Sequence, residues 1–369
     1  MKIERVEVFG VAMPLIGEYK NAYRSKTVQK SAVVRITASN GTVGLGNIDP
    51  SPGYSKETIE DSLHMLKTKL AGLVIGMDPT NVHCVLQKIE PMIVGYYDAK
   101  AAIEMACVDL AARVCGVPVY TYLGGAVKDT LMFNAWIGIL PPAEAAAEAL
   151  VWQKRGFRSA KIKVGGDIEA DRDRVEAVRE VVGSDFELRI DANAGYDADT
   201  SIKLARMMVP FNLQLFEQPV PWNDIAGMAR VRSEACGIPI MADESVLDHA
   251  SLINIIKADA ADIVKVKVMK QGGFLNTRRM IATAEAAGVR CVLGHGFGLG
   301  INTMAEIMCA VTSENVIDGL ECVGPLKTSD DIITSKLDLT SGSITLPEGP
   351  GLGVEIDEVK LKRYRSDVQ

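Results

Sequence analysis

Residues 187–193 read Glu-Leu-Arg-Ile-Asp-Ala-Asn, and the same arrangement returns at 213–219 as Leu-Gln-Leu-Phe-Glu-Gln-Pro and at 238–244 as Ile-Pro-Ile-Met-Ala-Asp-Glu. Each stretch is a short apolar run that ends in an acidic side chain. Such runs, bounded by polar residues, are typical of strands that are buried on both faces. We therefore predict parallel strands, each with an acid at its carboxyl end.

The repeat extends over most of the chain. Similar runs begin near Leu131, Ala160, Glu187, Leu213, Ile238, Asp262, Val289 and Val316, at intervals of roughly 24 to 29 residues. Segments with helical periodicity, such as Asp171–Val182 and Leu275–Ala287, lie between them. Strands that alternate with helices predict a parallel sheet. An open doubly wound sheet would usually carry a glycine-rich phosphate turn after its first strand. The sequence has none there, so we predict an α/β fold with a closed parallel barrel.

The residues before the repeat are organised differently. Strands are predicted at Val6–Pro14 and Ser31–Ser39, and helices at Lys56–Ala71 and Tyr97–Val114. We expect residues 1–125 to form a smaller α+β domain.

Two further segments complete this division of the chain. The barrel is expected over residues 126–341, and residues 342–369 should pack back on the first domain. Two loops, Leu15–Gln29 and Asn47–Ser55, are predicted from their polar or glycine- and proline-rich composition. Taken alone, they are more typical of solvated connections than of a lid over a pocket.

Composition limits the possible partners. The chain has 369 residues, of which 48% are hydrophobic and 24% charged, and a net charge of −7. A nucleic-acid surface would need a clustered basic excess, and no apolar run reaches the roughly 18 residues that span a bilayer. We therefore expect neither nucleic acid nor a membrane as partner.

The seven cysteines and the start of the chain bear on location. The cysteines are scattered, mostly inside apolar segments, and no pair has zinc-ligand spacing. The first residues alternate like a strand and lack the apolar block of a signal peptide. We interpret the cysteines as reduced core residues of a cytoplasmic protein.

Asp191, Glu217 and Asp243 end three successive predicted strands and are separated by 26 residues each. Equal spacing of one strand–helix unit should place the three carboxylates at one height in a barrel, where active sites lie. Each acid alone could cap the following helix. Three converging carboxylates repel one another, and all-oxygen ligands with open positions suit Mg²⁺. The sequence therefore predicts a magnesium site.

Two pairs of lysines flank the acids. Lys161 and Lys163 are two residues apart on one predicted strand and so share a face, and Lys265 and Lys267 repeat the pattern across the barrel. Lysines on an inward face are costly unless they serve a function. At about 6 Å and an effective dielectric near 20, two ammonium groups repel by roughly 3 kcal/mol. This repulsion should lower the pKa of one lysine by about 2, which favours Lys163 and Lys267 as acid/base groups on opposite faces of a substrate.

These groups together predict a reaction class. The proton next to a carboxylate is too weakly acidic for an unaided amine, and Mg²⁺ on the carboxylate stabilises the enediolate that forms. We therefore expect a small-molecule carboxylate substrate. Two bases on opposite faces suit racemization or epimerization, and the same groups would serve cycloisomerization of a small carboxylate or amino-acid derivative. Dehydration of a hydroxy acid is the alternative.

The motifs resemble the enolase superfamily, in the muconate lactonizing enzyme (muconate cycloisomerase) subgroup of the mandelate racemase/muconate lactonizing enzyme family. The resemblance covers nearly the whole chain. It rests on Lys161-x-Lys163, Asp191-x-Asn193, Glu217-Gln-Pro219, Asp243-Glu-Ser245, Lys267 before Gly272-Gly273, Glu321 and Gly349-Pro-Gly-Leu-Gly353. It implies a modified TIM barrel, (β/α)₇β, with an N-terminal α+β capping domain whose loops close over the substrate. It also implies a homo-oligomer.

The resemblance assigns roles residue by residue. Asp191, Glu217 and Asp243 are similar to the metal ligands, and Lys163 and Lys267 to the acid/base pair. Lys161 is similar to the lysine that tunes Lys163 and contacts the carboxylate, which makes it a third catalytic residue. The polar residues expected to bind substrate are Tyr19, Tyr23, Tyr54, His295 and Glu321.

Several departures from the family pattern limit the function. Strand eight lacks the Asp-x-Asp with which dipeptide epimerases hold an α-ammonium group. Strand seven ends Gly294-His295-Gly296 and lacks the Met-x-Glu-Ser of several racemases. His295 could bind substrate or hold a backbone carbonyl; it does not match the mandelate racemase base, because Lys267 stands where that subgroup has an aspartate.

Two other classes of function remain open on the sequence. A barrel lysine could form a Schiff base, as in an aldolase, although the three acids argue against it. A binding protein on an enzyme-derived scaffold is also conceivable, because fold does not imply function.

Overall fold

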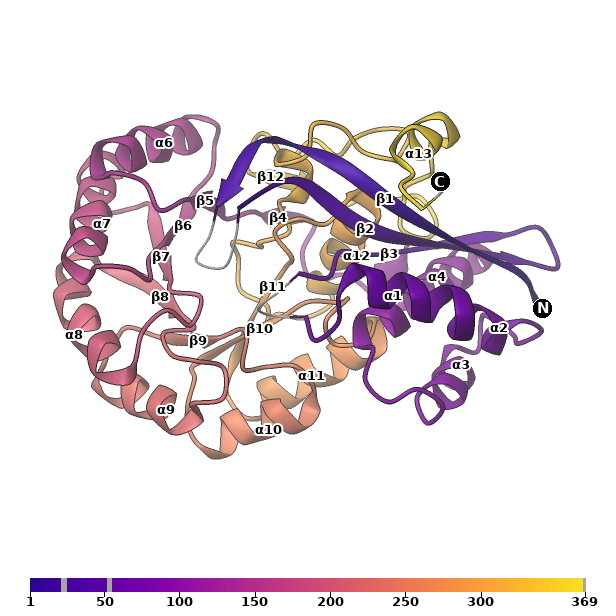
Figure 1. Cartoon of the computed structure of the whole chain (residues 1–369), viewed down its shortest axis with the longest axis horizontal. Coiled ribbons are helices and arrows are strands. Elements are labelled where there is room, and N and C mark those ends of the chain that lie inside the picture. Colours follow the sequence, from indigo (N-terminus) through magenta and orange to yellow (C-terminus); the bar gives the residue numbers. More distant parts are fainter. Residues whose placement is uncertain (21–24, 52–54, 368–369) are drawn as a thin grey trace.

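The computed structural model describes residues 1–20, 25–51 and 55–367, with the backbone alone for residues 18–20 and 25. It contains a three-stranded antiparallel sheet with its helices and a curled parallel sheet surrounded by helices (Figure 1). Tyr23 and Tyr54 lie outside the described residues, and so does the side chain of Tyr19. Where these three point is therefore not described.

The antiparallel sheet has the order β1 (Ile3–Lys20), β2 (Ser25–Ala38) and β3 (Val43–Ile48). The predicted loop over 15–29 is wrong for its two ends, because β1 runs to Lys20 and β2 begins at Ser25. Pairing of β2 with β3 covers only residues 32–37 of β2. The outer part of the β1–β2 hairpin extends beyond β3, where β1 and β2 pair with each other. Its sequence is polar and lacks the apolar alternation that would predict a strand. It reaches the barrel, where the Ile16 amide donates to the Lys327 carbonyl at 2.8 Å.

Helices cover one face of this sheet. They are α1 (Ile59–Met65), a π-helical turn (Leu66–Leu70), α2 (Ala71–Val74), α3 (Val82–Ile89), α4 (Tyr97–Cys115) and α5 (Val119–Tyr122). The alanine-rich α4 packs so closely on β3 that a Cβ on Gly44 or Gly46 would lie 2.0 Å from a backbone carbonyl of α4. Small residues on both elements thus allow the buried contact that joins this sheet to the rest of the core.

The parallel sheet has the order β11-β10-β9-β8-β7-β6-β5. Its strands are β5 (Ala135–Ile137), β6 (Ser159–Lys163), β7 (Glu187–Asp191), β8 (Leu213–Glu217), β9 (Ile240–Ala242), β10 (Ile263–Val266) and β11 (Arg290–Leu293). The helices between and after them are α6 (Pro142–Lys154), α7 (Ile168–Val182), α8 (Ala198–Met208), α9 (Ile225–Glu234), α10 (His249–Lys257), α11 (Phe274–Ala286) and α12 (Gly300–Ala310). Strand and helix alternate as the sequence predicts, and Figure 1 shows the helices on the outside of the curled sheet.

Residues 316–320 fill the eighth position of the barrel. Val316 bridges Cys291 of β11, and Leu320 bridges Phe133 on the other side, both in parallel fashion. The chain therefore closes the ring through isolated bridges and not through a regular strand. Gly294 makes the closure possible, because its φ is 141° and a Cβ there would lie 2.5 Å from the Cys322 amide nitrogen.

Aspartates begin four of the outer helices. The side chains of Asp167, Asp197, Asp224 and Asp248 accept hydrogen bonds from the first turns of α7, α8, α9 and α10. Such caps satisfy amides that have no partner inside the helix. The metal-ligand candidates lie elsewhere, at the strand ends, so they do not serve as these caps.

The end of the chain returns to the antiparallel sheet. A two-stranded antiparallel sheet joins β4 (Thr130–Met132) to β12 (Ser343–Thr345), and α13 (Glu358–Tyr364) follows. Arg365 bridges Val11 of β1, and the Ser366 amide donates to the Gly10 carbonyl at 2.9 Å. The division of the chain at residues 125 and 341 stays a prediction.

Three of the seven cysteines do not lie in the core. Cys84, Cys115 and Cys236 are exposed, whereas the other cysteines are buried, so the prediction that all seven are core residues is wrong for these three. They lie at helix ends or turns, where the local hydrophobicity of the sequence does not report burial.

Over residues 1–20, 25–51 and 55–367, no helix has the length and apolar character to cross a membrane.

Candidate active site

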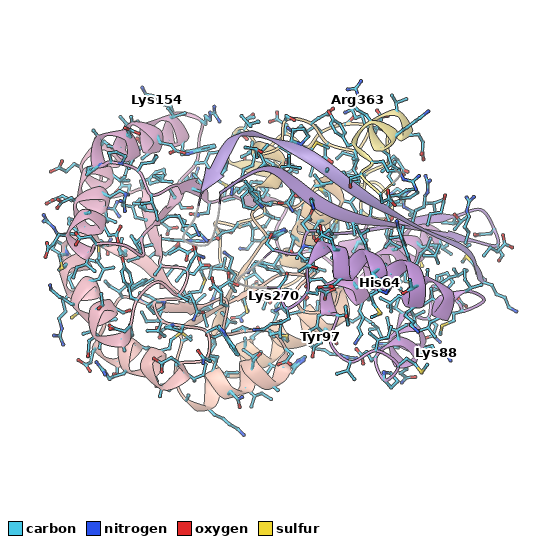
Figure 2. The ribbon with its side chains drawn as sticks, in the orientation of Figure 1. His64, Lys88, Tyr97, Lys154, Lys270 and Arg363 are labelled. Carbon is cyan, nitrogen blue, oxygen red and sulfur yellow. The ribbon has the colours of Figure 1, made fainter. Side chains whose placement is uncertain are left out.

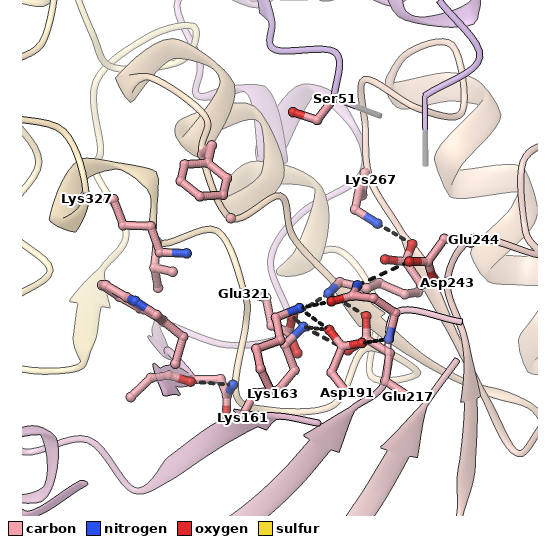
Figure 3. A pocket seen from close by; sticks show the side chains of 18 of the residues that line it. Ser51, Lys161, Lys163, Asp191, Glu217, Asp243, Glu244, Lys267, Glu321 and Lys327 are labelled. Atoms are coloured by element: carbon pink, nitrogen blue, oxygen red, sulfur yellow. Dashed lines mark hydrogen bonds and ion pairs between the residues drawn. The ribbon is translucent and has the colours of Figure 1, made fainter. Parts of the chain in front are cut away.

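The carboxyl ends of the parallel strands meet in one pocket (Figure 3). Lys163 at the end of β6 is in register with Asp191 of β7, and Asp191 is in register with Glu217 of β8. Asp243 follows β9, and Lys267 follows β10. All five side chains line the pocket. The strand order therefore places the three acids between the two lysines, as the spacing of the sequence predicts.

The chain turns sharply just after these strands. Asn193, Ala194 and Gln218 have positive φ angles of 44°, 61° and 35°. The Gln218 side chain ties two strand ends together, because its oxygen accepts from the Asp243 amide at 3.0 Å and its nitrogen donates to the Ser245 hydroxyl at 2.8 Å. Residues held in sparsely populated backbone conformations cluster at functional sites.

Lys161 lies deepest on the β6 side. Its ammonium group is 2.8 Å from Glu217, 3.1 Å from Asp191 and in contact with Glu321. Burial opposes its charge, but the three carboxylates outweigh burial and raise its pKa well above the usual value. The sequence predicts a lowered pKa for one lysine of this pair, with Lys163 as the favoured base, and Lys161 is the partner that keeps its charge.

Lys163 stands one step above Lys161 on the same face of β6. Its ammonium group donates to Asp191 at 2.5 Å and to the Asn193 side-chain oxygen at 2.6 Å. Asn193 in turn donates to Glu244 at 3.2 Å. The structure places the Asn193 amide between Lys163 and Glu244.

The β10 side repeats this arrangement with one difference. Lys265 contacts Glu217 at 3.1 Å and also Glu321, and Lys267 contacts Asp243. Here a further lysine, Lys270, is 2.8 Å from the same Asp243 oxygen. Burial lowers the pKa of Lys267 to about 7, with help from the charges of Lys270 and Lys265 and against the attraction of Asp243. Like-charge repulsion of the kind that the sequence predicts thus contributes to the lowered pKa of Lys267, but burial is the larger cause.

The acids respond to the same charges. Burial works against the charged form of Asp243, but Lys267 and Lys270 outweigh it and hold the pKa of Asp243 well below its usual value. Burial and the charge of Asp191 raise the pKa of Glu217, in spite of its two lysines. Burial, with the neighbouring acids, raises the pKa of Glu244 to about 8. Glu244 is therefore mostly protonated at neutral pH.

A magnesium ion fits the donor set, although the three acids do not form a ready cage. Asp191, Glu217 and Asp243 supply only oxygen atoms from three adjacent strand ends, and their mutual repulsion raises the pKa of Glu217. In the described part of the chain, however, no three histidine, cysteine or acidic side chains are grouped closely enough to hold a metal. The lysine ammonium groups separate the carboxylates and neutralise them instead.

The predicted substrate-binding residues have different positions. Glu321 lines the pocket, where it contacts Lys161, Lys265 and, at 3.4 Å, Arg189. His295 does not line it: the ring is 1% exposed and its Nε2 atom is 3.9 Å from Asp49. Burial and four surrounding lysine charges hold the pKa of His295 well below its usual value, so the ring is neutral.

The remaining histidines lie far from this pocket. His64 on α1 and His83 on α3 are exposed, and His249 begins α10. Figure 2 labels His64 on α1 and Lys270 near the middle of the picture. None of these three described histidines lines the pocket.

Several pocket residues escaped the sequence analysis. Lys26 from β2, Trp136 from β5, Phe297 from the loop after β11 and Lys327 line the side away from Asp243. Ser51, in the second predicted loop, also lines the pocket. Lys327 follows a short 3₁₀ turn beyond the last barrel segment, where no strand pattern signals an inward-facing residue. Trp136 lies next to a predicted strand, and Lys26 and Ser51 lie in the two loops that the resemblance places over the substrate, so these three had a signal that could have been used.

Comparisons with known proteins place this geometry in a family. Residues 4–124 match the model of the mandelate racemase/muconate lactonizing enzyme N-terminal domain, and residues 143–360 match that of the enolase C-terminal domain-like family. The L-Ala-D/L-Glu epimerase of Bacillus subtilis is 35% identical over 96% of this chain and 97% of its own. Muconate cycloisomerase 1 of Rhodococcus opacus is 31% identical over 99% and 98%.

Solved structures agree with these relatives. The N-succinyl Arg/Lys racemase of Bacillus cereus has a TM-score of 0.95, with 32% identity over 99% of this chain and 98% of that one. A dipeptide epimerase of Enterococcus faecalis, solved with Mg and the dipeptide L-Leu-L-Tyr, has a TM-score of 0.92, with 30% identity over 96% and 99%.

The names of these relatives are those of racemases, epimerases and cycloisomerases, which are all isomerases. They confirm the predicted enzyme class and do not favour the dehydratase alternative. The enolase-like barrel with an N-terminal capping domain is confirmed as well. Because both family models match, and together span most of the chain, this protein belongs to the mandelate racemase/muconate lactonizing enzyme family of the enolase superfamily.

Proposed function

We propose that this protein moves the α-proton of a small carboxylate substrate in an Mg²⁺-dependent reaction, giving racemization, epimerization or cycloisomerization. One observation carries the proposal: Lys163 and Lys267 reach one pocket from β6 and from the end of β10, and the strands between them lead to Asp191, Glu217 and Asp243. This arrangement offers two amines on opposite sides of a reacting carbon and three acids between them.

We assign the metal to the three acids. Mg²⁺, when bound by Asp191, Glu217 and Asp243, supplies positive charge that stabilises the extra negative charge of the deprotonated carboxylate. Oxygen-only ligands from adjacent strand ends support the assignment. The E. faecalis relative that was solved with Mg supports it by analogy.

The lysines move the proton. Lys163 takes it from one face of the α-carbon, or returns it there, and Lys267 acts on the opposite face. Lys161 keeps its positive charge, because its pKa is raised, and is suited to bind the substrate carboxylate. Glu321 holds Lys161 and Lys265 in place from below. Ring closure in a cycloisomerization would need one of the two acid/base groups, and inversion would need both.

The other expectations of the sequence stay proposals of the same kind. We propose that the protein acts in the cytoplasm as a homo-oligomer. The residues 1–125 form the capping domain in this proposal, and its two loops, with Tyr19, Tyr23 and Tyr54, contact the substrate.

Incubation in D₂O tests the reaction class directly. The full chain with Mg²⁺ is offered a panel of N-acylated amino acids, dipeptides and unsaturated dicarboxylates, and α-deuterium is followed by NMR and mass spectrometry. We expect deuterium at the α-carbon with inversion for a racemase or epimerase, and a lactone for a cycloisomerase. EDTA should stop exchange, and Mg²⁺ should restore it.

Two results would contradict the proposal. Full activity in EDTA would remove the role of the metal. Trapping of the substrate on a lysine by borohydride would instead support the Schiff-base chemistry of an aldolase.

A further inference from the structure

The backbones of Lys163 and Lys267 are held in different ways. Lys163 is the last residue of β6, and it is in register with Asp191 of the neighbouring strand. Lys267 comes one residue after the end of β10, whose pairing with β11 ends at Val266. The sheet therefore fixes the backbone of Lys163, whereas the backbone of Lys267 is held by contacts from outside the sheet.

Two buried side chains supply those contacts. The Lys267 amide donates to the Oε1 atom of Gln271 at 2.6 Å, and the Val268 amide donates to the Oε1 atom of Glu306 at 2.9 Å. Gln271 is itself anchored, because its nitrogen donates to the backbone oxygen of Val246 at 3.2 Å. Glu306 belongs to α12 and is fully buried. Neither of these two described side chains lines the pocket.

The acid at position 306 is not explained by packing. Burial raises the pKa of Glu306 to about 8, although the Val268 hydrogen bond and nearby lysine charges oppose the rise, so the group is mostly protonated at neutral pH. Its second oxygen, Oε2, is buried without a hydrogen-bond partner in the part of the chain that the structure describes. Because such an atom is destabilising, an apolar residue would suit α12 better if the helix only had to pack.

The side chain of Lys267 leaves this anchored backbone towards the acids. It contacts Asp243, as Figure 3 shows, and only 2% of the residue is exposed. A shift of the backbone at Lys267 moves the ammonium group by a comparable distance. A misplacement of about 1 Å at a reacting group can lower the rate by about 100-fold.

We propose that Glu306, together with Gln271, is a positioning residue for Lys267, because it holds the backbone just beyond β10 so that the ammonium group faces the reacting carbon. The inference rests on the proposed function and assigns Glu306 to one face of the substrate. Proton transfer on the opposite face, by Lys163, is supported by the pairing of β6 with β7 and should not depend on Glu306.

Exchange of separate enantiomers in D₂O, with the full chain and Mg²⁺, tests this inference. Lys267→Ala first identifies the enantiomer whose α-proton Lys267 removes. Glu306→Ala should slow exchange of that enantiomer by about 100-fold through kcat, with KM and the other enantiomer unchanged. Glu306→Gln should restore most of the rate, because its amide oxygen can accept from the Val268 amide as the protonated acid does.

Two further variants separate positioning from general destabilisation. Asp109 on α4 is also a fully buried acid, and it accepts from the amides of Leu45 and Leu352 at 2.8 Å and 2.7 Å. Asp109→Ala should lower the melting temperature without affecting one enantiomer more than the other. Gln271→Ala removes the other anchor of Lys267 and should slow the same enantiomer as Glu306→Ala, so it replaces that variant if Glu306→Ala does not fold.

Crystal structures distinguish a failure of this inference from a failure of the proposed function. Between the wild type and Glu306→Ala at equal Mg²⁺ concentration, we expect the Lys267 ammonium nitrogen to shift by about 1 Å or more and Lys163 to stay in place. An unmoved Lys267, or equal slowing of both enantiomers, would overturn the positioning role. A displaced Lys267 in a protein whose wild type exchanges no ligand would support the positioning role and count against proton transfer.

Discussion

The two lysine pairs of the pocket have the same sequence pattern but different surroundings. Lys161 and Lys265 occupy equivalent places: each contacts Glu217 and Glu321, and carboxylates raise the pKa of each against burial. Lys163 and Lys267 each contact the aspartate at a neighbouring strand end. The halves differ because an amide, Asn193, accompanies Lys163, whereas a third lysine, Lys270, accompanies Lys267.

This difference shows that a lysine pattern alone does not set the pKa of an amine. Lys161 and Lys265 are surrounded by acids and keep their charge, which suits them to bind a carboxylate. Lys267 shares one acid with Lys270, and its pKa falls to about 7, which suits proton transfer. The number of carboxylates around each ammonium group therefore distinguishes a lysine suited to binding from one suited to proton transfer. That number depends on which strands are neighbours in the sheet.

The largest expected effect comes from replacing one of the two proposed acid/base lysines at a time. Lys163→Ala and Lys267→Ala should each lower turnover by about 10³-fold or more, because loss of an acid/base group costs on the order of 10²- to 10⁴-fold. If the two lysines act on opposite faces, each variant should still exchange the α-proton of one enantiomer but not of the other. Deuterium exchange with separate enantiomers measures this.

Lys128→Met is the control for that pair, because Lys128 lies outside the pocket and contacts Asp318 at 2.8 Å. Equal exchange of both enantiomers by both alanine variants would contradict the assignment of the lysines to opposite faces. Equal loss of both would favour a single base.

The second effect concerns Glu321, the acid that contacts both Lys161 and Lys265. Glu321→Gln keeps the shape of the side chain but leaves Lys161, Lys265 and Arg189 with one carboxylate fewer. Breaking a buried ion pair from one side typically costs about 3–5 kcal/mol. We expect a loss of this size in the free energy of unfolding, measured by urea denaturation.

The matched control is Glu234→Gln, which removes an exposed acid 3.0 Å from Arg206. Exposed ion pairs contribute about 1 kcal/mol or less. A loss at Glu321 no greater than the loss at Glu234 would show that the buried network is not stabilised by this carboxylate.

A third, smaller effect concerns Lys270, which distinguishes the surroundings of Lys267 from those of Lys163. Lys270→Met removes two hydrogen bonds, at 2.7 Å to the backbone oxygen of Asp243 and at 2.8 Å to its side chain. Hydrogen bonds to charged groups contribute about 1.5–3 kcal/mol, so we expect a loss in that range. The exposed Lys203→Met serves as control in the same denaturation series. A neutral or stabilising Lys270→Met would mean that repulsion between Lys270 and Lys267 outweighs these bonds.

The smallest effect within any one pH unit concerns a buried acid that is held by backbone amides. Glu104 on α4 accepts from the amides of Phe274 and Leu275 at the start of α11, and burial raises its pKa to about 7 from 4.5. Between these values the folded protein holds a proton that the unfolded chain has released. Its contribution to stability is therefore fully present below pH 4.5 and lost as the pH rises towards 7, by at most about 1.4 kcal/mol per pH unit.

Glu104→Gln should flatten the pH dependence of stability across this window, as followed by urea denaturation at several pH values. Asp243 is the contrast, because Lys267 and Lys270 outweigh burial and lower its pKa. An acid of that kind stabilises the fold at higher pH and loses its contribution as the pH falls. An unchanged slope in Glu104→Gln would contradict the raised pKa of Glu104.

Much of the barrel could be predicted because its pattern is local. Apolar runs at regular intervals, each followed by a helix, locate the strands, and the parallel order follows from the alternation. The outer half of the β1–β2 hairpin could not be predicted, since among the described residues its strands pair there only through Tyr19 with Lys26 and Lys20 with Ser25, and Leu15 and Ile16 are held by residues 327–328 of the barrel. The eighth barrel position was predicted near Val316, but its reduction to single bridges depends on how the ring closes.

The sequence by itself determined which side chains end the strands: the acids at 191, 217 and 243 and the lysines at 161, 163, 265 and 267 lie at fixed places in a repeating unit. The tertiary structure alone decided which lysine meets which acid, that Lys270 joins Asp243, and that Lys26 and Lys327 reach the same ring. The reason is physical. A strand's periodicity fixes the face of a side chain, whereas its charge neighbours, and hence its pKa, come from segments that closure of the barrel brings within a few ångströms.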